Sequence, residues 1–204
     1  RERKMWGEVG SRPKFWEYFR YWKKARPEYR KLLLVLVFFS FFNLSDVFLL
    51  LRVGELAGDA AAVRYFIFYN LVYAFAAYPC GWLADKVGIR SVFAVGLACF
   101  ASSCLGMAFD SAHTLWFGVF AAYGLFMAAT EGGAKAWLSA WADKNDAGAA
   151  VGLYDSLNSV ALLTAGVAAG ALWQWAGPNP VFVVVAAVAG GVAVVVWFLP
   201  SSKR

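Results

Sequence analysis

The sequence contains little charge, few cysteines and a single histidine. Only 16% of its 204 residues are Asp, Glu, Lys or Arg and 61% are hydrophobic, with a mean hydropathy of +0.57, a balance far from that of a soluble domain. It contains no CxxC pair, no HExxH motif and no Cys/His cluster, so we expect no metal site, cofactor or enzymatic centre. Cys80, Cys99 and Cys104 lie inside apolar runs and are expected to be small core residues. The composition predicts an integral membrane protein.

Positive charge is concentrated at the start of the chain. Residues 1–31 contain 11 Lys and Arg against 4 Asp and Glu, a net charge of 11 − 4 = +7, whereas the remainder carries 8 − 9 = −1. The stretch PKFWEYFRYWKKARP interleaves charged and aromatic residues. This pattern is typical of an amphipathic helix at a lipid headgroup surface rather than of a nucleic-acid-binding tail. A flexible linker is the alternative interpretation.

Six apolar stretches follow, each long enough to cross a bilayer core of about 30 Å as a helix. Their separators are short, so neighbouring helices are expected to be antiparallel, with both chain ends on one side. Lys and Arg gather on that side, which the positive-inside rule assigns to the cytoplasm. The predicted spans are 32–56, 61–84, 89–109, 113–141, 148–175 and 179–199. The expected fold is an all-α membrane protein with a cytoplasmic linker (1–31), a six-helix transmembrane bundle (32–200) and a cytoplasmic tail (201–204).

Glycine and proline positions predict how the helices pack. In the fifth span, Gly148 with Gly152 and Gly166 with Gly170 are small residues one turn apart, a spacing that allows close helix approach in lipid. Pro79 is expected to kink the second span.

The stretch GWLADKVGIR, residues 81–90, connects the second and third spans. Gly81 permits close helix contact, Gly88 allows the backbone to reverse, and Asp85 can accept hydrogen bonds from amides at a helix N-terminus. Lys86 and Arg90 hold the turn on the cytoplasmic side. A chance loop of this orientation would need the basic residues, but not the glycines and the aspartate at these spacings.

This pattern, G-x-L-A-D-K-x-G-x-R, resembles the signature loop of major facilitator superfamily transporters. In that family the loop lies between helices two and three and recurs between helices eight and nine, where it latches the cytoplasmic side in one state. The stretches FFNLSDVFLLLRV, YNLVYAFAAYPCGWLAD, TEGGAKAWLSA and GLYDSLNSVALLTAGVAAGALWQWAGP resemble the seventh, eighth, tenth and eleventh helices of bacterial drug-efflux-like members.

The resemblance implies the C-terminal six-helix half of such a transporter, with part of the central cytoplasmic linker, in a bacterial inner membrane. It also implies a second six-helix bundle as partner, either an N-terminal half absent from this sequence or another chain. Small-molecule efflux by alternating access, with coupling to protons, is the activity it suggests. One departure is Ala147, which stands where relatives commonly carry an arginine, so the latch contact of that arginine is lost.

Charged and amide side chains occur inside the predicted spans. Each charge would cost about 2.5 to 3.5 kcal/mol if it faced lipid, so we expect these residues to face a cavity or one another. Asp46 and Glu131 are the preferred carriers of a proton or substrate, followed by Asp155. The candidate pathway residues are Asn43, Asp46, Asn70, Glu131, Lys135, Asp155 and Asn158.

Two interpretations of Glu131 and Lys135 are open. They form a mainly structural i,i+4 ion pair, or they belong to a site where three acids and one lysine cannot all stay ionised, so that one acid exchanges a proton or meets a cationic substrate. Arg52 and Glu55, near the outer end of the first span, are expected to form a surface pair.

The sequence therefore predicts secondary transport of a small molecule. The alternative is a non-transporting six-helix binding or assembly subunit, whose internal charges only pair with one another. The expected partners are a small-molecule substrate, protons, the lipid bilayer and a second six-helix bundle, without nucleic acid.

Overall fold

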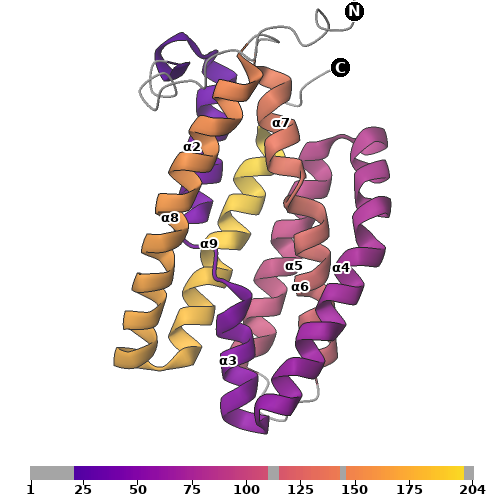
Figure 1. The fold of residues 1–204 in the computed structure, drawn as a ribbon, viewed down its shortest axis with the longest axis vertical. Helices are drawn as coiled ribbons and strands as arrows, with labels where there is room; N and C mark the ends of the chain where they lie inside the picture. Colours follow the sequence, from indigo (N-terminus) through magenta and orange to yellow (C-terminus); the bar gives the residue numbers. More distant parts are fainter. Residues whose placement is uncertain (1–20, 110–114, 143–145, 200–204) are drawn as a thin grey trace, which may run out of the picture.

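The computed structural model describes residues 21–109, 115–142 and 146–199, and within these ranges the chain contains helices and short connections without a strand. The all-helical class is confirmed for this part (Figure 1). Most of the predicted amphipathic tail falls on residues 1–20, outside the described ranges. The helices are α2 (Pro27–Ser40), α3 (Asp46–Ala57), α4 (Asp59–Val87), α5 (Ile89–Phe109), α6 (Trp116–Thr130), α7 (Gly133–Trp141), α8 (Ala147–Ala176) and α9 (Pro178–Phe198).

Four helices are long and apolar enough to cross a membrane unaided: α4, α5, α8 and α9. Their bounds agree within three residues with the predicted second, third, fifth and sixth spans. Pro79 lies inside α4, which continues as one helix to Val87.

The first predicted span, 32–56, is not one helix. It is divided into α2 and α3 by a non-helical connection over residues 41–45. The break has a local cause, because Ser45 adopts extended backbone angles and its hydroxyl accepts a hydrogen bond from the Val47 amide at 3.4 Å, which starts a new helix. Asp46 therefore occupies the first turn of α3 instead of a helix middle. The two helices lie end to end (Figure 1) and together contain 26 helical residues (14 + 12), about 39 Å of helix.

The fourth predicted span, 113–141, is also divided, into α6 and α7. Glu131 and Gly132 separate the two, although both keep right-handed helical backbone angles. The amide of Glu131 still bonds to the Met127 carbonyl at 3.0 Å, and the Ala136 amide bonds to the Gly132 carbonyl at 3.2 Å. The interruption is a local loosening of the helix, and α7 continues along the line of α6 (Figure 1).

Single glycines join three pairs of consecutive helices. Gly58, Gly88 and Gly177 have φ angles of 84°, 92° and 83°, which side chains of L-residues rarely tolerate. Each glycine ends one helix, and the next helix begins at the following residue. The predicted reversal at Gly88 is confirmed. The start of α2, the end of α9 and the α4–α5 turn lie at the same end of the bundle (Figure 1).

Helix α5 is the central packing element, and it contacts α9 and α6 most extensively. Close approach depends on glycines other than the predicted ones. A Cβ at Gly96 would lie 2.7 Å from the Ala129 Cβ, and one at Gly106 would lie 2.6 Å from a Val119 methyl.

No helix in the described part of this chain approaches Gly81, Gly148, Gly166 or Gly170 closely, because a Cβ at each would meet nothing within 4 Å. These glycines lie on α8 and α4, whose surfaces are largely uncovered. Only 11% of the most apolar window of each helix is buried, compared with 56% in α5.

Candidate functional site

A polar cavity of about 300 Å³ lies among α2, α5, α6, α7 and α8. Its position is supported by the buried Tyr29, whose hydroxyl donates a hydrogen bond to the Ala150 carbonyl at 2.7 Å and so ties α2 to α8. The cavity brings together five of the seven predicted pathway residues from three separate segments of the chain. The polar side chains that line it are Ser40, Asn43, Thr130, Glu131, Lys135, Tyr154, Asp155 and Asn158.

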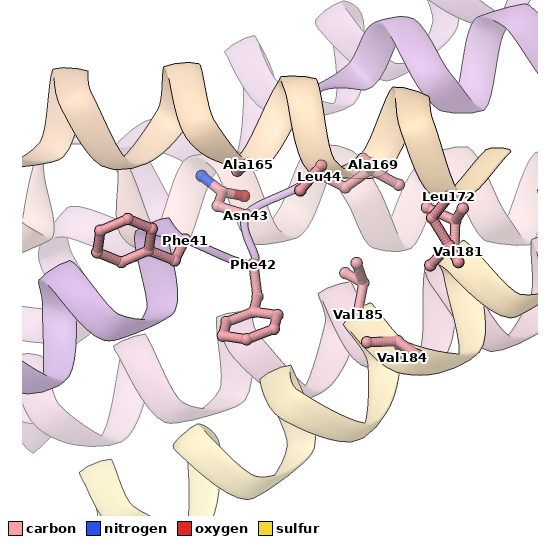
Figure 2. A pocket seen from close by; sticks show the side chains of 11 residues that line it. Phe41, Phe42, Asn43, Leu44, Ala165, Ala169, Leu172, Val181, Val184 and Val185 are labelled. Carbon is pink, nitrogen blue, oxygen red and sulfur yellow. The ribbon is translucent and has the colours of Figure 1, made fainter. Parts of the chain in front are cut away.

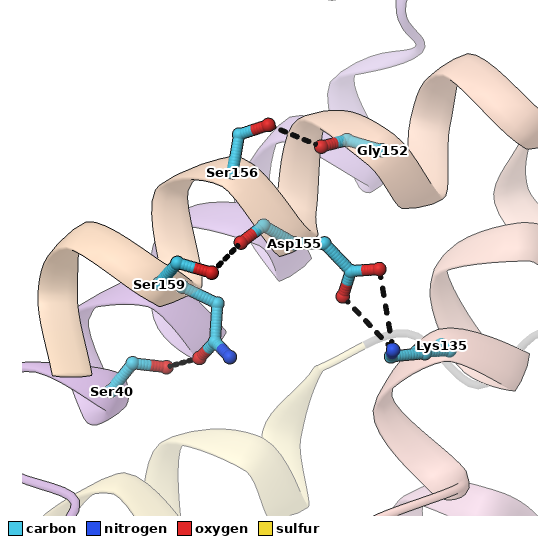
Figure 3. Close-up of polar contacts among 7 residues, drawn as sticks. Ser40, Lys135, Gly152, Asp155, Ser156 and Ser159 are labelled. Atoms are coloured by element: carbon cyan, nitrogen blue, oxygen red, sulfur yellow. Dashed lines mark hydrogen bonds and ion pairs between the residues drawn. The ribbon is translucent and has the colours of Figure 1, made fainter.

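An ion pair crosses this cavity between α7 and α8. The ammonium nitrogen of Lys135 lies 3.1 Å from one carboxylate oxygen of Asp155 and 3.2 Å from the other, as Figure 3 shows. Of the two interpretations of Glu131 and Lys135, the i,i+4 ion pair is therefore contradicted. Glu131 ends α6, whereas Lys135 belongs to α7, and α7 packs against α8, which presents Asp155 to the lysine.

A second polar contact in the cavity connects the end of α2 to α8. The Ser40 hydroxyl lies 2.6 Å from Asn158 Oδ1 and 2.9 Å from the Leu36 carbonyl, and Figure 3 shows it beside the Lys135–Asp155 pair. The sequence reasoning missed Ser40 and Thr130. Both carry a hydroxyl within an apolar run. Ser40 lies close in sequence to Asn43 and Thr130 lies next to Glu131, and this proximity was the available sign that they belong to the site.

Glu131 lies where the cavity meets a second hollow. This larger groove, of about 700 Å³, extends between α4 and the α6–α7 segment as far as the 81–90 turn. Among the described residues, only Glu131 and Met127 line both hollows. The Tyr73 hydroxyl, on α4, lies beside the Glu131 carboxylate, and the Asp85 and Lys86 side chains line the far end of the groove.

Asp46 and Asn70 do not line the polar cavity. The Asp46 carboxylate accepts hydrogen bonds from the Tyr69 hydroxyl and from the Ser45 hydroxyl. Tyr69 packs edge-on against Tyr123, with 5.3 Å between ring centroids. The break before α3 therefore directs Asp46 toward the aromatic cluster of α4 and α6, and the Asn70 amide donates to the Phe66 carbonyl one turn earlier on α4.

Two cationic side chains of residues 81–90 make defined contacts, one within α4 and one to the end of α9. The Lys86 ammonium lies 3.8 Å from the centre of the Trp82 ring, a cation–π geometry. The Arg90 guanidinium donates a hydrogen bond to the Leu199 carbonyl at 2.9 Å, at the C-terminal end of α9. Because carbonyl groups at a helix C-terminus have no partner within the helix, Arg90 stabilises the junction of α5 and α9.

Other predicted side chains lie away from the cavity. The Arg52–Glu55 pair is confirmed, with 3.6 Å between the charged atoms. Cys104 is buried, as expected of a core residue, whereas Cys80 and Cys99 are half-buried, and all three thiols are free. In the described ranges, no three His, Cys, Asp or Glu side chains are grouped so that they could hold a metal ion.

A small apolar pocket adjoins the break between α2 and α3. It has a volume of about 130 Å³ and lies against α8 and α9, with Asn43 as its one polar lining residue (Figure 2). The connection between α2 and α3 therefore lies between this apolar pocket and the polar cavity, and Asn43 lines both.

The chain resembles known membrane transporters. The model of the Major Facilitator Superfamily matches residues 32–204. An uncharacterized MFS-type transporter of the archaeon Methanocaldococcus jannaschii is 30% identical over 159 residues, which are 74% of this chain and 40% of that relative. No solved structure matches the chain. The chain spans about two fifths of the length of this curated relative.

Proposed function

Since this chain belongs to the major facilitator superfamily, we propose that it forms one six-helix half of a secondary transporter that moves a small molecule by alternating access. The chain is an integral membrane protein of a transporter family, which points away from an enzymatic role. A second six-helix bundle, from another part of the protein or from another chain, would supply the other half. The proposed location is a bacterial inner membrane.

Six membrane crossings are proposed from four continuous helices and two divided ones. The pair α6 and α7 contains 24 helical residues (15 + 9), about 36 Å, so each divided pair exceeds a bilayer core of about 30 Å. Irregular backbone at membrane depth is tolerated where it lines a cavity. Asn43 and Glu131, which lie at the two interruptions, both line the polar cavity. The cytoplasmic assignment of both ends rests on the positive-inside rule.

The polar cavity is the observation that carries the proposed substrate site. Counted from the ends of their helices, Glu131 lies about 15 Å and Asp155 about 12 Å from the membrane surface, near the middle of the core. An ion pair and an amide–hydroxyl contact at this depth would be costly against lipid. Their placement in a hollow supports a role in binding.

The uncovered faces of α4 and α8 support the proposed second half. Both helices are long and apolar enough to cross a membrane, yet only 11% of the most apolar stretch of each is buried. The open glycines of α8, Gly148, Gly166 and Gly170, would allow a helix of the partner bundle to approach closely. Such a partner would close the polar cavity on its open side.

The 81–90 turn is proposed to act as a cytoplasmic latch. Gly88 forms the α4–α5 reversal and Arg90 joins α5 to the end of α9, while Lys86 packs on Trp82 within α4. The groove connects this turn to Glu131. Movement of the turn could therefore change access to Glu131 from the cytoplasmic side.

The proposal is tested by transport in proteoliposomes that contain the chain together with its second half. The fluorescent probes are ethidium, fluorescein and Nile red, which are cationic, anionic and neutral. We expect at least one probe to move faster than in protein-free liposomes, and Lys135→Met to slow it at least fivefold. Arg52→Gln, which breaks an ion pair outside the cavity, serves as the matched control and should transport normally.

Two results would count against the proposal. If no probe moves faster than in protein-free liposomes, transport of these compound classes is refuted. If Lys135→Met lowers stability without changing the flux, the ion pair has only a structural role. That result favours the alternative of an assembly subunit, in which internal charges only pair with one another.

A further inference from the structure

We propose that Glu131 is the counter-ion for a monovalent organic cation that binds where the polar cavity meets the groove between α4 and the α6–α7 segment. This inference rests on the proposed function, because it assigns a charge class to the substrate of the same cavity. It concerns binding alone and can be tested without measuring transport.

The charge balance of the cavity singles out Glu131. Two acidic side chains, Glu131 and Asp155, and one basic side chain, Lys135, line the cavity. Lys135 and Asp155 neutralise one another at 3.1 Å. Within the described ranges no cationic side chain lies at ion-pair distance from Glu131, so the described residues leave this carboxylate without a counter-charge of their own.

The space around Glu131 is suited to a ligand of molecular size. The cavity has a volume of about 300 Å³ and the groove about 700 Å³, in the size range of small-molecule sites. Glu131 and Met127 form the wall that the two hollows share. A ligand whose charge contacts Glu131 can therefore extend its apolar parts into either hollow.

The walls favour an organic cation over a small hydrated ion. Phe39, Phe93 and Phe126 line the cavity, and aromatic faces attract organic cations. Met127 is a flexible, polarisable side chain that adapts to ligands of varied shape. Tyr73 places its hydroxyl beside Glu131 from the groove side, where it can orient the carboxylate.

The experiment measures binding of two probes of nearly equal shape and opposite charge, tetraphenylphosphonium and tetraphenylborate. The chain is purified together with its second half into phosphatidylcholine nanodiscs, and binding is compared with that of empty nanodiscs. We expect saturable binding of the phosphonium, weakened at least tenfold by Glu131→Gln. The matched control Glu55→Gln removes the same charge at the outer end of α3, away from both hollows, and should bind as the unmodified chain does.

A second variant keeps the test decisive if Glu131→Gln fails to fold. Lys135→Gln removes the partner of Asp155 and leaves a second carboxylate without a counter-charge, so we expect phosphonium to bind at least threefold more tightly. Circular dichroism of each variant checks that the helices are retained.

Several outcomes would overturn the inference. These are tighter binding of the borate than of the phosphonium, equal weakening by Glu55→Gln and Glu131→Gln, unchanged phosphonium binding in Glu131→Gln, and weaker binding in Lys135→Gln. Failure here is distinguishable from failure of the proposed function. A protein that moves fluorescein or Nile red but does not bind phosphonium contradicts only the charge assignment, whereas one that binds phosphonium but moves no probe contradicts only transport.

Discussion

Substituting Gly124 by alanine should separate helices α4 and α6. A Cβ at this position would lie 2.7 Å from the Tyr69 carbonyl oxygen and 2.9 Å from the Val72 Cβ, whereas ordinary contact begins at 3.4 Å. The nearest atom belongs to the backbone and cannot rotate away. The two helices must therefore move apart by roughly 3.4 − 2.7 = 0.7 Å at this point.

The expected magnitude combines two opposing effects. Overpacking a close contact costs about 1 to 3 kcal/mol, while replacing glycine by alanine inside a helix gains about 1 kcal/mol. Gly118→Ala on the same helix has the gain in helix propensity without the overpacking cost, because its Cβ would meet nothing within 4 Å. We expect Gly118→Ala to be neutral or slightly stabilising, and the free energy of unfolding of Gly124→Ala to be lower by about 2 kcal/mol than that of Gly118→Ala.

The assay is reversible unfolding of the full chain in detergent micelles by titration with sodium dodecyl sulfate, followed by circular dichroism. Because Tyr69 contributes both the close carbonyl and the hydroxyl that binds Asp46, the Gly124 variant should also disturb the α3–α4 contact. Equal unfolding free energies for the Gly118 and Gly124 variants would refute the argument that α4 and α6 meet at this glycine.

Three further substitutions test local features of the fold. Gly88→Ala should lower the free energy of unfolding by about 2 kcal/mol, because a φ of 92° is strained for any side chain; micelle unfolding measures it. Arg90→Ala should destabilise the chain by about 1.5 kcal/mol and increase hydrogen exchange at the end of α9, because the Leu199 carbonyl loses its charged donor. Tyr69→Phe should cost about 1 kcal/mol in the same assay, since it removes the hydrogen bond to Asp46.

Each of these three has a matched control. Gly148→Ala changes a helical glycine with open space around it, so a loss as large as that of Gly88→Ala would contradict the backbone argument. Arg64→Ala removes the same charge elsewhere on the chain, and it should leave exchange at the end of α9 unchanged. Tyr78→Phe removes a hydroxyl from a side chain that is 82% exposed, so equal costs for the two tyrosine variants would contradict the Asp46 contact.

The two divided spans show where prediction from sequence was incomplete. Hydropathy locates 32–56 and 113–141 as apolar stretches, but it is averaged over many residues and does not register a break of a few residues. The motif Asn-Leu-Ser-Asp at 43–46 contained the signal for the first break, since Ser45 is a favoured helix N-cap and Asp46 suits a first turn. The interruption at Glu131 and Gly132 had a weaker signal, because both residues keep helical backbone angles.

The sequence predicted part of the residues that line the polar cavity, but not which of them pair. Polar side chains inside apolar spans can be recognised from the sequence because exposing them to lipid is costly. Five of the seven predicted residues line one cavity. The expected Glu131–Lys135 pair followed from helical spacing, which assumes one uninterrupted helix. The loosened backbone at Gly132 and the neighbouring α8 instead give Lys135 a closer partner in Asp155.

The sequence by itself determined the features that depend on short stretches of chain. Bilayer thickness relates the length of an apolar run to a span, and backbone sterics reserve positive φ angles for glycine, so four of the six predicted spans and the Gly88 turn could be predicted from the sequence. Tertiary structure alone decided which glycines are in close contact and which charges meet. Those outcomes depend on how helices distant in sequence pack, as Gly124 against Tyr69 and Lys135 against Asp155 show, and no local pattern contains that information.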